Sequence, residues 1–317
     1  MSVHLGNTLH PQEKSASTTR NHPFQKFRQR GILFKHLRSN ALRAVLLLIL
    51  VLTPVTGVAP SEEPIRISGS TTIQPIAAAL ASVYESRTNE KVVVTGGGSG
   101  RGIQDVLEGK SHLGMVSRSL KDEEKNKLQH VTIGYDALVI IVNTANPLET
   151  ISRDTLVNLY TGKIQSWKEI SAWDQPVVLV SKEFGRGTLE LFMQYTGLRH
   201  PQEREKYPAG PFISEAAFEV GSNLESITLV GGIPNAIGYV SMGTAFALQA
   251  QGMPIKVLTL EGVVPSKETV QNGTYPVIRE LNLVFTDPSQ VQPLIDLFLS
   301  PEGQRALINE GFIPAVR

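Results

Sequence analysis

The sequence predicts an α/β protein built on open, mostly parallel sheets, and three observations support this class. Short apolar segments of strand character alternate with helical segments from Ile65 onward, and strands separated by helices pair in parallel. Turns rich in Gly, Ser and Thr stand where a strand leads into a helix. The 317 residues, 41% hydrophobic and 19% charged, are sufficient for one large or two modest domains.

The first elements of this pattern follow one another at short intervals. The β-branched run Lys91–Thr95 is typical of a buried strand, and Ile73–Ser86 has the periodicity of a helix. We also expect strands at Ile65–Ser68 and Leu113–Val116 and a second helix over Ile103–Glu108.

The later elements are longer. Residues 135–147 (YDALVIIVNTANP) form an apolar strand that we expect to cross between two lobes, and Ser152 is a plausible N-cap of the next helix. Residues 235–248 predict a strand, a turn and a helix. Residues 275–287 predict a strand, and residues 291–312 predict a helical tail.

The N-terminal residues 1–59 are set apart by charge and predict an export signal or a membrane anchor. Residues 1–43 carry eight Lys/Arg and one Glu, and residues 44–59 carry no charge. The apolar run is short for a membrane span and Pro54 interrupts it, so cleavage between Thr56 and Ser61 is the first expectation and an uncleaved anchor the alternative. The chain has no cysteine, which excludes a lipoprotein anchor, disulfides and thiol chemistry.

The body of the chain is acidic. From Pro60 onward, 22 basic and 28 acidic residues give a net charge of about −6, which argues against a nucleic-acid-binding protein. A site for an anion in such a body depends on local dipoles and a few placed cations.

Three turns share one design, in which a strand is followed by Gly, Ser or Thr residues and then by a helix. They lie at Ser68–Pro75, Gly96–Gly102 and Phe184–Phe192. Each offers unpaired N–H groups and the positive end of a helix dipole, and the turns of an open α/β sheet face one crevice. The sequence therefore predicts a site for an anion. A fourth segment, Met115–Leu120, ends a strand with Ser117, Arg118 and Ser119.

Motifs of enzymes are absent or incomplete. The glycine-rich run at residues 96–102 lacks the spacing of a dinucleotide-binding loop, and the serine elbow of hydrolases fails because Arg101 replaces its last glycine. The histidines show no spacing for a metal, so we expect no metal, no cofactor and no catalytic residue. A phosphate-ester hydrolase with Ser70 or Ser99 as nucleophile stays open as an alternative.

In order along the chain, several motifs together resemble a known family. They are ISGSTTIQP, GGGSGRGI, LGMVSRSLKDEE, YDALVIIVNTANPLETIS, LVNLYTGKIQSW, GRGTLELF, IPNAIGYVS and YPVIRELNLV, and they span most of residues 65–317. This set resembles the phosphate-binding component of bacterial phosphate ABC transporters, within the class of type II periplasmic binding proteins.

The resemblance implies a two-lobed binding protein outside the cytoplasmic membrane. Such a protein, expected to be a monomer, closes on a dehydrated phosphate ion and delivers it to a membrane permease. One lobe would comprise residues 62–143 and 250–317, and the other residues 144–249. Alternatives are a protein that binds another oxyanion, such as sulfate or molybdate, and a membrane-tethered phosphate sensor.

The resemblance also implies which residues bind the anion. These are Ser70, Thr71, Ser99, Ser117 or Arg118, Gly187 and Thr188.

The third turn departs from the family pattern. The family places an arginine where this chain has Lys182 and a serine where it has Arg186, so we expect both cations at the site. A carboxylate that accepts the P–OH proton would favour phosphate over sulfate. Asp136 is the first candidate for this role and Glu183 the second.

Overall fold

The structure, a computed structural model, describes residues 63–315. The predicted export signal or anchor of residues 1–59 lies outside the described residues. None of the helices in residues 63–315 combines the length and the hydropathy of a membrane span. The α/β class is confirmed, because strands and helices alternate along most of this part of the chain.

The strands fall close to the positions that the apolar segments predicted, with several short additions. They are β1 (Ile65–Gly69), β2 (Val92–Gly96), β3 (Leu113–Val116), β4 (Gln129–Asn143), β5 (Thr150–Ile151), β6 (Val178–Lys182), β7 (Phe218–Val220), β8 (Ala236–Ser241), β9 (Ile255–Val257), β10 (Thr259–Leu260), β11 (Ile278–Phe285) and β12 (Ile313–Pro314).

The helices include the predicted ones and several that the sequence did not indicate. They are α2 (Gln74–Thr88), α3 (Ser99–Leu107), α4 (Asp122–Lys125), α5 (Arg153–Tyr160), α6 (Gly187–Thr196), α7 (Asn223–Gly232), α8 (Met242–Ala250), α9 (Lys267–Gln271), α10 (Gln292–Leu299) and α11 (Pro301–Asn309), with 3₁₀ turns η1 (Trp167–Glu169) and η2 (Pro201–Glu203). Ser152 caps α5 as predicted, since its hydroxyl accepts a hydrogen bond from the Thr155 N–H.

One mixed sheet connects most of the strands, in the order β2-β1-β3-β11-β4-β8-β6-β7. β1 is parallel to β2 and β3, and β6 is parallel to β7 and β8, as the strand–helix alternation predicted. β4 and β11 instead run antiparallel to each other, and β4 is also antiparallel to β8. Neither strand is a successive member of a simple βαβ unit, so the alternation did not determine its direction.

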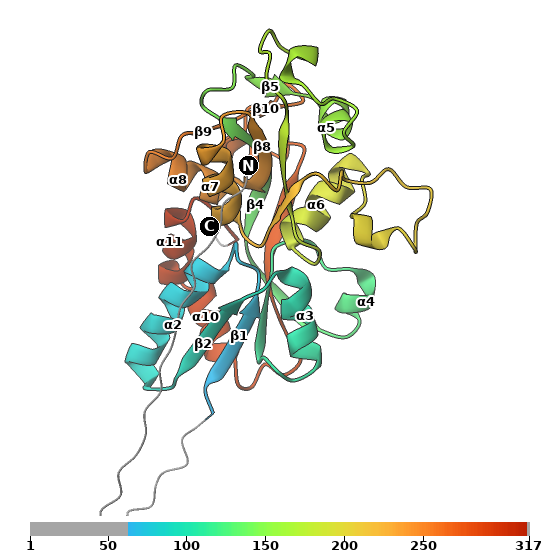
Figure 1. Ribbon diagram of the computed structural model, residues 1–317. Coiled ribbons are helices and arrows are strands. Elements are labelled where there is room, and N and C mark those ends of the chain that lie inside the picture. The colour runs from blue at the N-terminus through green and yellow to red at the C-terminus, as the bar shows by residue number, and fades with distance from the viewer. Residues whose placement is uncertain (1–62, 316–317) are drawn as a thin grey trace, which may run out of the picture. The chain divides into compact units, whose positions relative to one another are not determined.

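Strand β4 is shared by the two parts of the sheet and runs through the centre of Figure 1. Its first part, residues 129–137, pairs with β11, and its second part, residues 138–142, pairs with β8. We call the part built on β1, β2, β3 and β11 the first lobe, and the part built on β6, β7 and β8 the second lobe. The predicted crossing strand is thus present.

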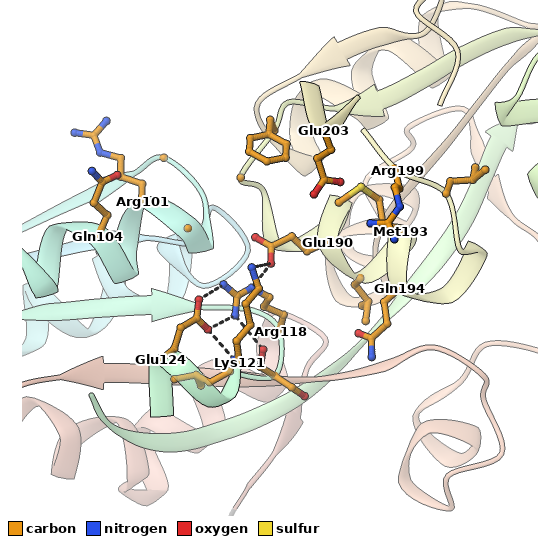
Figure 2. A pocket seen from close by; sticks show the side chains of 18 of the residues that line it. Arg101, Gln104, Arg118, Lys121, Glu124, Glu190, Met193, Gln194, Arg199 and Glu203 are labelled. Atoms are coloured by element: carbon orange, nitrogen blue, oxygen red, sulfur yellow. Dashed lines mark hydrogen bonds and ion pairs between the residues drawn. The ribbon is translucent and has the colours of Figure 1, made fainter. Parts of the chain in front are cut away.

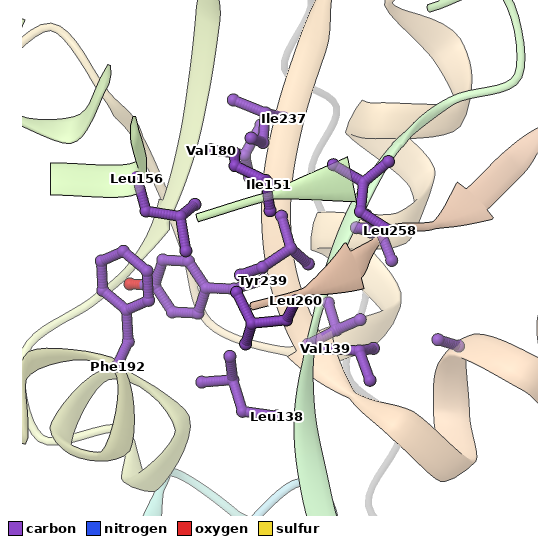
Figure 3. Packing of buried hydrophobic residues seen from close by; sticks show 14 of the residues in the cluster. Leu138, Val139, Ile151, Leu156, Val180, Phe192, Ile237, Tyr239, Leu258 and Leu260 are labelled. Carbon is purple, nitrogen blue, oxygen red and sulfur yellow. The ribbon is translucent and has the colours of Figure 1, made fainter. Parts of the chain in front are cut away.

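The second lobe has the larger hydrophobic cluster, part of which is drawn in Figure 3. At its centre the rings of Phe192 and Tyr239 stack with their centroids 3.9 Å apart and an interplanar angle of 1°. Residues Ile255, Leu258 and Val270 also pack in this cluster. They come from residues 250–317, which were expected to belong to the first lobe. The expected lobe boundaries stay a prediction.

The first lobe has a cluster on each face of its sheet. Helices α2, α10 and α11 cover one face, and α3 covers the other (Figure 1). Successive side chains of β11 point to opposite faces of the sheet, so Leu283 packs in the first cluster and Val284 in the second. The strand ends of both lobes are thereby held next to β4, where the candidate site lies.

Candidate anion-binding site

A small cavity lies where turns from the two lobes meet, and we call it the central cavity. Its volume is about 10 Å³, near the roughly 10–15 Å³ that one water molecule needs. Its lining consists mainly of glycine, serine and threonine, with two cations. The lining residues are Ser70, Thr71, Thr72, Gly98, Ser99, Ser117, Lys182, Arg186, Gly187, Thr188, Gly221, Ser222 and Asn223.

The three predicted strand-to-helix turns all reach the central cavity. Helix α3 begins at Ser99, within the glycine-rich turn and before the predicted start at Ile103, and α6 begins at Gly187. Neither helix has a side-chain hydrogen bond at its N-cap. Their first N–H groups therefore lack partners within the helix, and the positive ends of both dipoles favour an anion in the cavity.

A fourth helix start, that of α7, was missed by the sequence analysis. Ser222 is its N-cap, and its hydroxyl accepts a hydrogen bond from the Glu225 N–H. The amide of Asn223 donates to Thr72 Oγ1 at 3.1 Å and so joins the second lobe to the first. The signal was present in the sequence, because a serine followed three residues later by glutamate is typical of a helix N-terminus.

Glycines allow the two lobes to touch backbone to backbone at the cavity. The N–H of Gly100 donates to the carbonyl of Gly185 at 3.1 Å. Gly98 has a φ of +95°, which favours glycine, and a Cβ on Gly187 would overlap the hydroxyl of Ser99. The glycines of the second and third turns are thus required for close approach of the lobes.

Three predicted serines form a hydrogen-bonded chain on the first-lobe side of the cavity. Ser70 Oγ donates to Ser117 Oγ at 2.8 Å. The backbone N–H of Ser117 donates to Ser99 Oγ at 3.0 Å. All three side chains are buried. The structure therefore brings Ser70, Ser99 and Ser117 together.

The structure does not bring Asp136 to the central cavity. Its Oδ2 accepts hydrogen bonds from Arg279 Nε at 2.9 Å and Nη2 at 2.6 Å, and its Oδ1 accepts from the Gly243 N–H at 3.3 Å. Asp136 and Arg279 face each other across the β4–β11 pair, and both side chains are fully buried. Since both carboxylate oxygens are engaged behind the cavity lining, the arrangement gives Asp136 a structural role.

Arg279 is a second residue that the sequence analysis did not select. Its Nη1 donates to Thr188 Oγ1 at 2.9 Å, and its Nη2 donates to Thr72 Oγ1 at 3.3 Å. Both threonines line the cavity, so Arg279 orients their hydroxyl groups from behind. Its signal was a single cation within the otherwise mostly apolar strand of residues 275–287, but its partner depends on the register of two distant strands.

Arg118 lies outside the central cavity, in a larger groove of about 1340 Å³ between α3, α4 and α6, which we call the outer groove (Figure 2). Its guanidinium makes a bidentate pair with Glu124 at 2.7 and 2.8 Å. Its Nε also lies 2.7 Å from Glu190 on α6, which belongs to the second lobe. Of the expected alternatives Ser117 and Arg118, only Ser117 lines the central cavity.

Lys182 and Arg186 of the third turn both line the central cavity. Arg186 is held by Glu183, whose Oε2 accepts from Nε at 3.1 Å and also from Nη2. Lys182 is buried, and its Nζ donates to the Ser222 carbonyl at 2.7 Å.

The environment of Lys182 disfavours its charged form. Burial lowers the pKa of Lys182 well below its ordinary value of 10.5, and Glu225 acts in the opposite direction. The nearby positive charges of Arg279 and Arg186 lower this pKa further.

Within residues 63–315, no three His, Asp or Glu side chains form a cluster that could hold a metal ion. The cavity instead presents N–H groups, hydroxyl groups and cations, all of which suit an oxyanion.

A family model described as PBP superfamily domain matches residues 54–302. A protein from Clostridium perfringens, described as a phosphate ABC transporter substrate-binding protein with bound phosphate, is 31% identical. Its comparison covers 80% of this chain and 99% of that one, with a TM-score of 0.70. The phosphate-binding protein PstS of Borreliella burgdorferi is 26% identical over 263 residues, which are 80% of this chain and 90% of that protein. The PstS of Bacillus subtilis is 27% identical over 265 residues, which are 81% of this chain and 83% of its relative.

The fold and the cavity define a two-lobed binding protein of the α/β class. The chain belongs to the PBP superfamily and, within it, to the family of substrate-binding proteins of phosphate ABC transporters.

Proposed function

We propose that this protein captures inorganic phosphate in the central cavity for import by an ABC transporter. The observation that carries the proposal is the convergence of the turn before α2 and the starts of α3, α6 and α7 on one cavity lined by hydroxyl groups and two cationic residues. The names of its relatives, which include phosphate-binding proteins from two bacteria, support phosphate as the anion.

The proposed contacts combine backbone and side-chain donors from both lobes. They come from Ser70, Thr71, Ser99, Ser117, Lys182, Arg186, Gly187 and Thr188. Thr72, Ser222 and Asn223 join this proposed set because they also line the central cavity. Arg118 and Asp136 leave it, since they have partners elsewhere.

A role as a hydrolase of phosphate esters finds no support in the cavity. A serine nucleophile needs a hydrogen-bonded base. The lining residues include no histidine, aspartate or glutamate, and the amino group of Lys182 donates to the Ser222 carbonyl while Ser70 and Ser99 are hydrogen-bonded to Ser117. A free, compact anion suits this site better.

In this proposal the protein acts outside the cytoplasmic membrane, as a monomer that delivers phosphate to a membrane permease. The basic and then apolar residues 1–59 support export. The mass of the mature protein separates the alternatives, because cleavage removes this segment and a membrane-tethered sensor keeps it.

Calorimetric titration of the purified protein with phosphate, sulfate and molybdate tests the proposal. We expect phosphate to bind with a Kd in the low micromolar range or below, which corresponds to about 8 kcal/mol. Sulfate and molybdate should bind more weakly. No binding at millimolar phosphate would refute the proposed function, and tighter binding of sulfate or molybdate would change the anion.

A further inference from the structure

The side chain of Lys182 ends in a buried amino group that lacks a carboxylate partner. Its Nζ donates to the backbone carbonyl of Ser222 at 2.7 Å, and the residue is 1% exposed. In residues 63–315, no Asp or Glu forms an ion pair with this ammonium group, whereas Arg186 and Arg279 each have one. A buried ammonium group without an anionic partner is costly in any fold.

The charged and polar groups around Lys182 add to this cost. On the third turn and on β11, Arg186 and Arg279 act as like charges, and only Glu225 on α7 acts in the opposite direction. On β8, Tyr239 presents a hydroxyl that accepts from the Lys182 backbone N–H at 3.2 Å. The positive helix ends at the cavity oppose a further cation.

The partners of the two arginines do not serve Lys182. Glu183 pairs with Arg186, and Asp136 pairs with Arg279, so neither carboxylate is available as a counter-ion for Nζ. The empty site therefore favours the neutral amine of Lys182, whose pKa burial lowers. A dianion in the cavity reverses this preference, because it supplies the missing negative charge at close range.

We propose that Lys182 takes up one proton when the anion binds, so that it is an amine in the empty site and an ammonium group in the occupied site. The inference rests on the proposed function, since it requires an anion in the central cavity.

The proton balance closes by either of two routes. When monohydrogen phosphate binds, the proton comes from the solvent and forms the third N–H bond at Nζ. When dihydrogen phosphate binds, the P–O–H bond breaks and its proton passes to the Nζ lone pair. Both routes end with the same charges on the anion and on Lys182.

This assignment differs from the role that Asp136 was expected to have, because an ammonium group donates hydrogen bonds and accepts none. A carboxylate would accept the anion's proton in a hydrogen bond, but Asp136 is engaged by Arg279 and Gly243. An arginine at position 182 would stay protonated, since burial does not lower the pKa of a guanidinium group to near neutral pH. Lysine at this position therefore makes binding depend on pH.

Calorimetry with inorganic phosphate in two buffers of different ionisation enthalpy measures the proton count directly. The pH is set where phosphate is almost wholly the dianion. We expect the wild-type chain to take up about one proton per phosphate bound. Lys182→Arg should bind phosphate with a proton uptake near zero. Lys121→Arg, at an exposed lysine of the outer groove, is the matched control and should retain the wild-type uptake.

The outcomes separate the inference from the proposed function. Phosphate binding without proton uptake in the wild type, or with equal uptake in Lys182→Arg, would overturn the inference and leave phosphate capture intact. Absence of binding in the wild type would overturn the function itself. If Lys182→Arg fails to fold, Lys182→Met serves instead, and an uptake equal to that of the wild type would overturn the inference.

Discussion

At the scale of single residues, Arg279 orients the hydroxyl group of Thr188 from the side away from the central cavity. Its Oγ1 accepts a hydrogen bond from Arg279 Nη1 at 2.9 Å. A hydroxyl that accepts on one side still has its own proton to donate. Because Thr188 lines the central cavity, that proton is available to an anion.

Replacement of Thr188 by valine keeps the shape of the side chain and removes this donor. We expect Thr188→Val to weaken phosphate binding by about 1–3 kcal/mol, as for a hydrogen bond to a charged group. The measurement is a calorimetric titration, and Thr228→Val on the exposed face of α7 is the control. Equal affinities of the two variants would show that the Thr188 hydroxyl does not contact the anion.

Arg186 is a cation whose charge is partly compensated. Glu183 binds its guanidinium, and 19% of the Arg186 side chain is exposed. Loss of the arginine would leave the Glu183 carboxylate unpaired near the central cavity, where it would repel an anion.

We therefore expect Arg186→Ser to weaken phosphate binding about tenfold, or about 1.4 kcal/mol. Glu183→Gln in the same chain should recover part of this loss by removing the unpaired charge. The four affinities of a double-mutant cycle check the coupling. A wild-type affinity of Arg186→Ser would indicate that Arg186 has no part in binding.

At the scale of elements, α4 and α6 are joined across the outer groove by one arginine. Arg118 lies between Glu124 of the first lobe and Glu190 of the second (Figure 2). Burial acts against the charged form of Glu124, but the hydrogen bond from Arg118 prevails and lowers the pKa of this carboxyl. The ion pair to Glu190 is the part of this cluster that forms only when the two lobes meet.

Glu190→Gln should weaken phosphate binding, because it removes an ion pair that stabilises the closed lobes while Arg118 keeps Glu124. We expect a loss of about 1.5 kcal/mol, near the lower limit for a charged hydrogen bond, because Glu190 is partly exposed. The loss should appear mainly as faster release of phosphate in stopped-flow measurements. Glu203 lines the same groove, so Glu203→Gln is the control. An equal release rate in both variants would contradict the role of Glu190.

At the scale of the whole molecule, the site costs stability. Lys182 lies at the end of β6, next to the cluster around Phe192 and Tyr239, and its ammonium group is disfavoured there. The unfolded chain holds this proton up to about pH 10.5, whereas the folded chain releases it at a lower pH. Stability therefore rises with pH between the folded-state pKa and 10.5, because the unfolded state binds more protons in this range.

Lys182→Met should accordingly raise the free energy of unfolding of the phosphate-free protein by about 1–4 kcal/mol near neutral pH. This gain should be largest below the folded-state pKa of Lys182 and should shrink as the pH approaches 10.5. Urea unfolding at several pH values measures it, with Lys121→Met as the exposed control. A gain that does not change with pH would indicate packing as its cause.

Local patterns were sufficient for much of this molecule. The apolar segments predicted β1, β2, β3 and the crossing strand β4, because hydrophobic periodicity reports on burial of a single element. The three turns predicted the anion cavity, because a helix start carries its unpaired N–H groups wherever the chain places it.

The α/β class, the turns and the donors that they carry follow from local sequence. Which charges meet depends on how the elements pack. The β4–β11 register set Arg279 opposite Asp136 and removed that carboxylate from the cavity, and lobe contact directed Arg118 to Glu190. The same packing left Lys182 with a carbonyl partner. Local sequence cannot fix such pairings, because they join residues that are distant in the chain and depend on strand register and lobe packing.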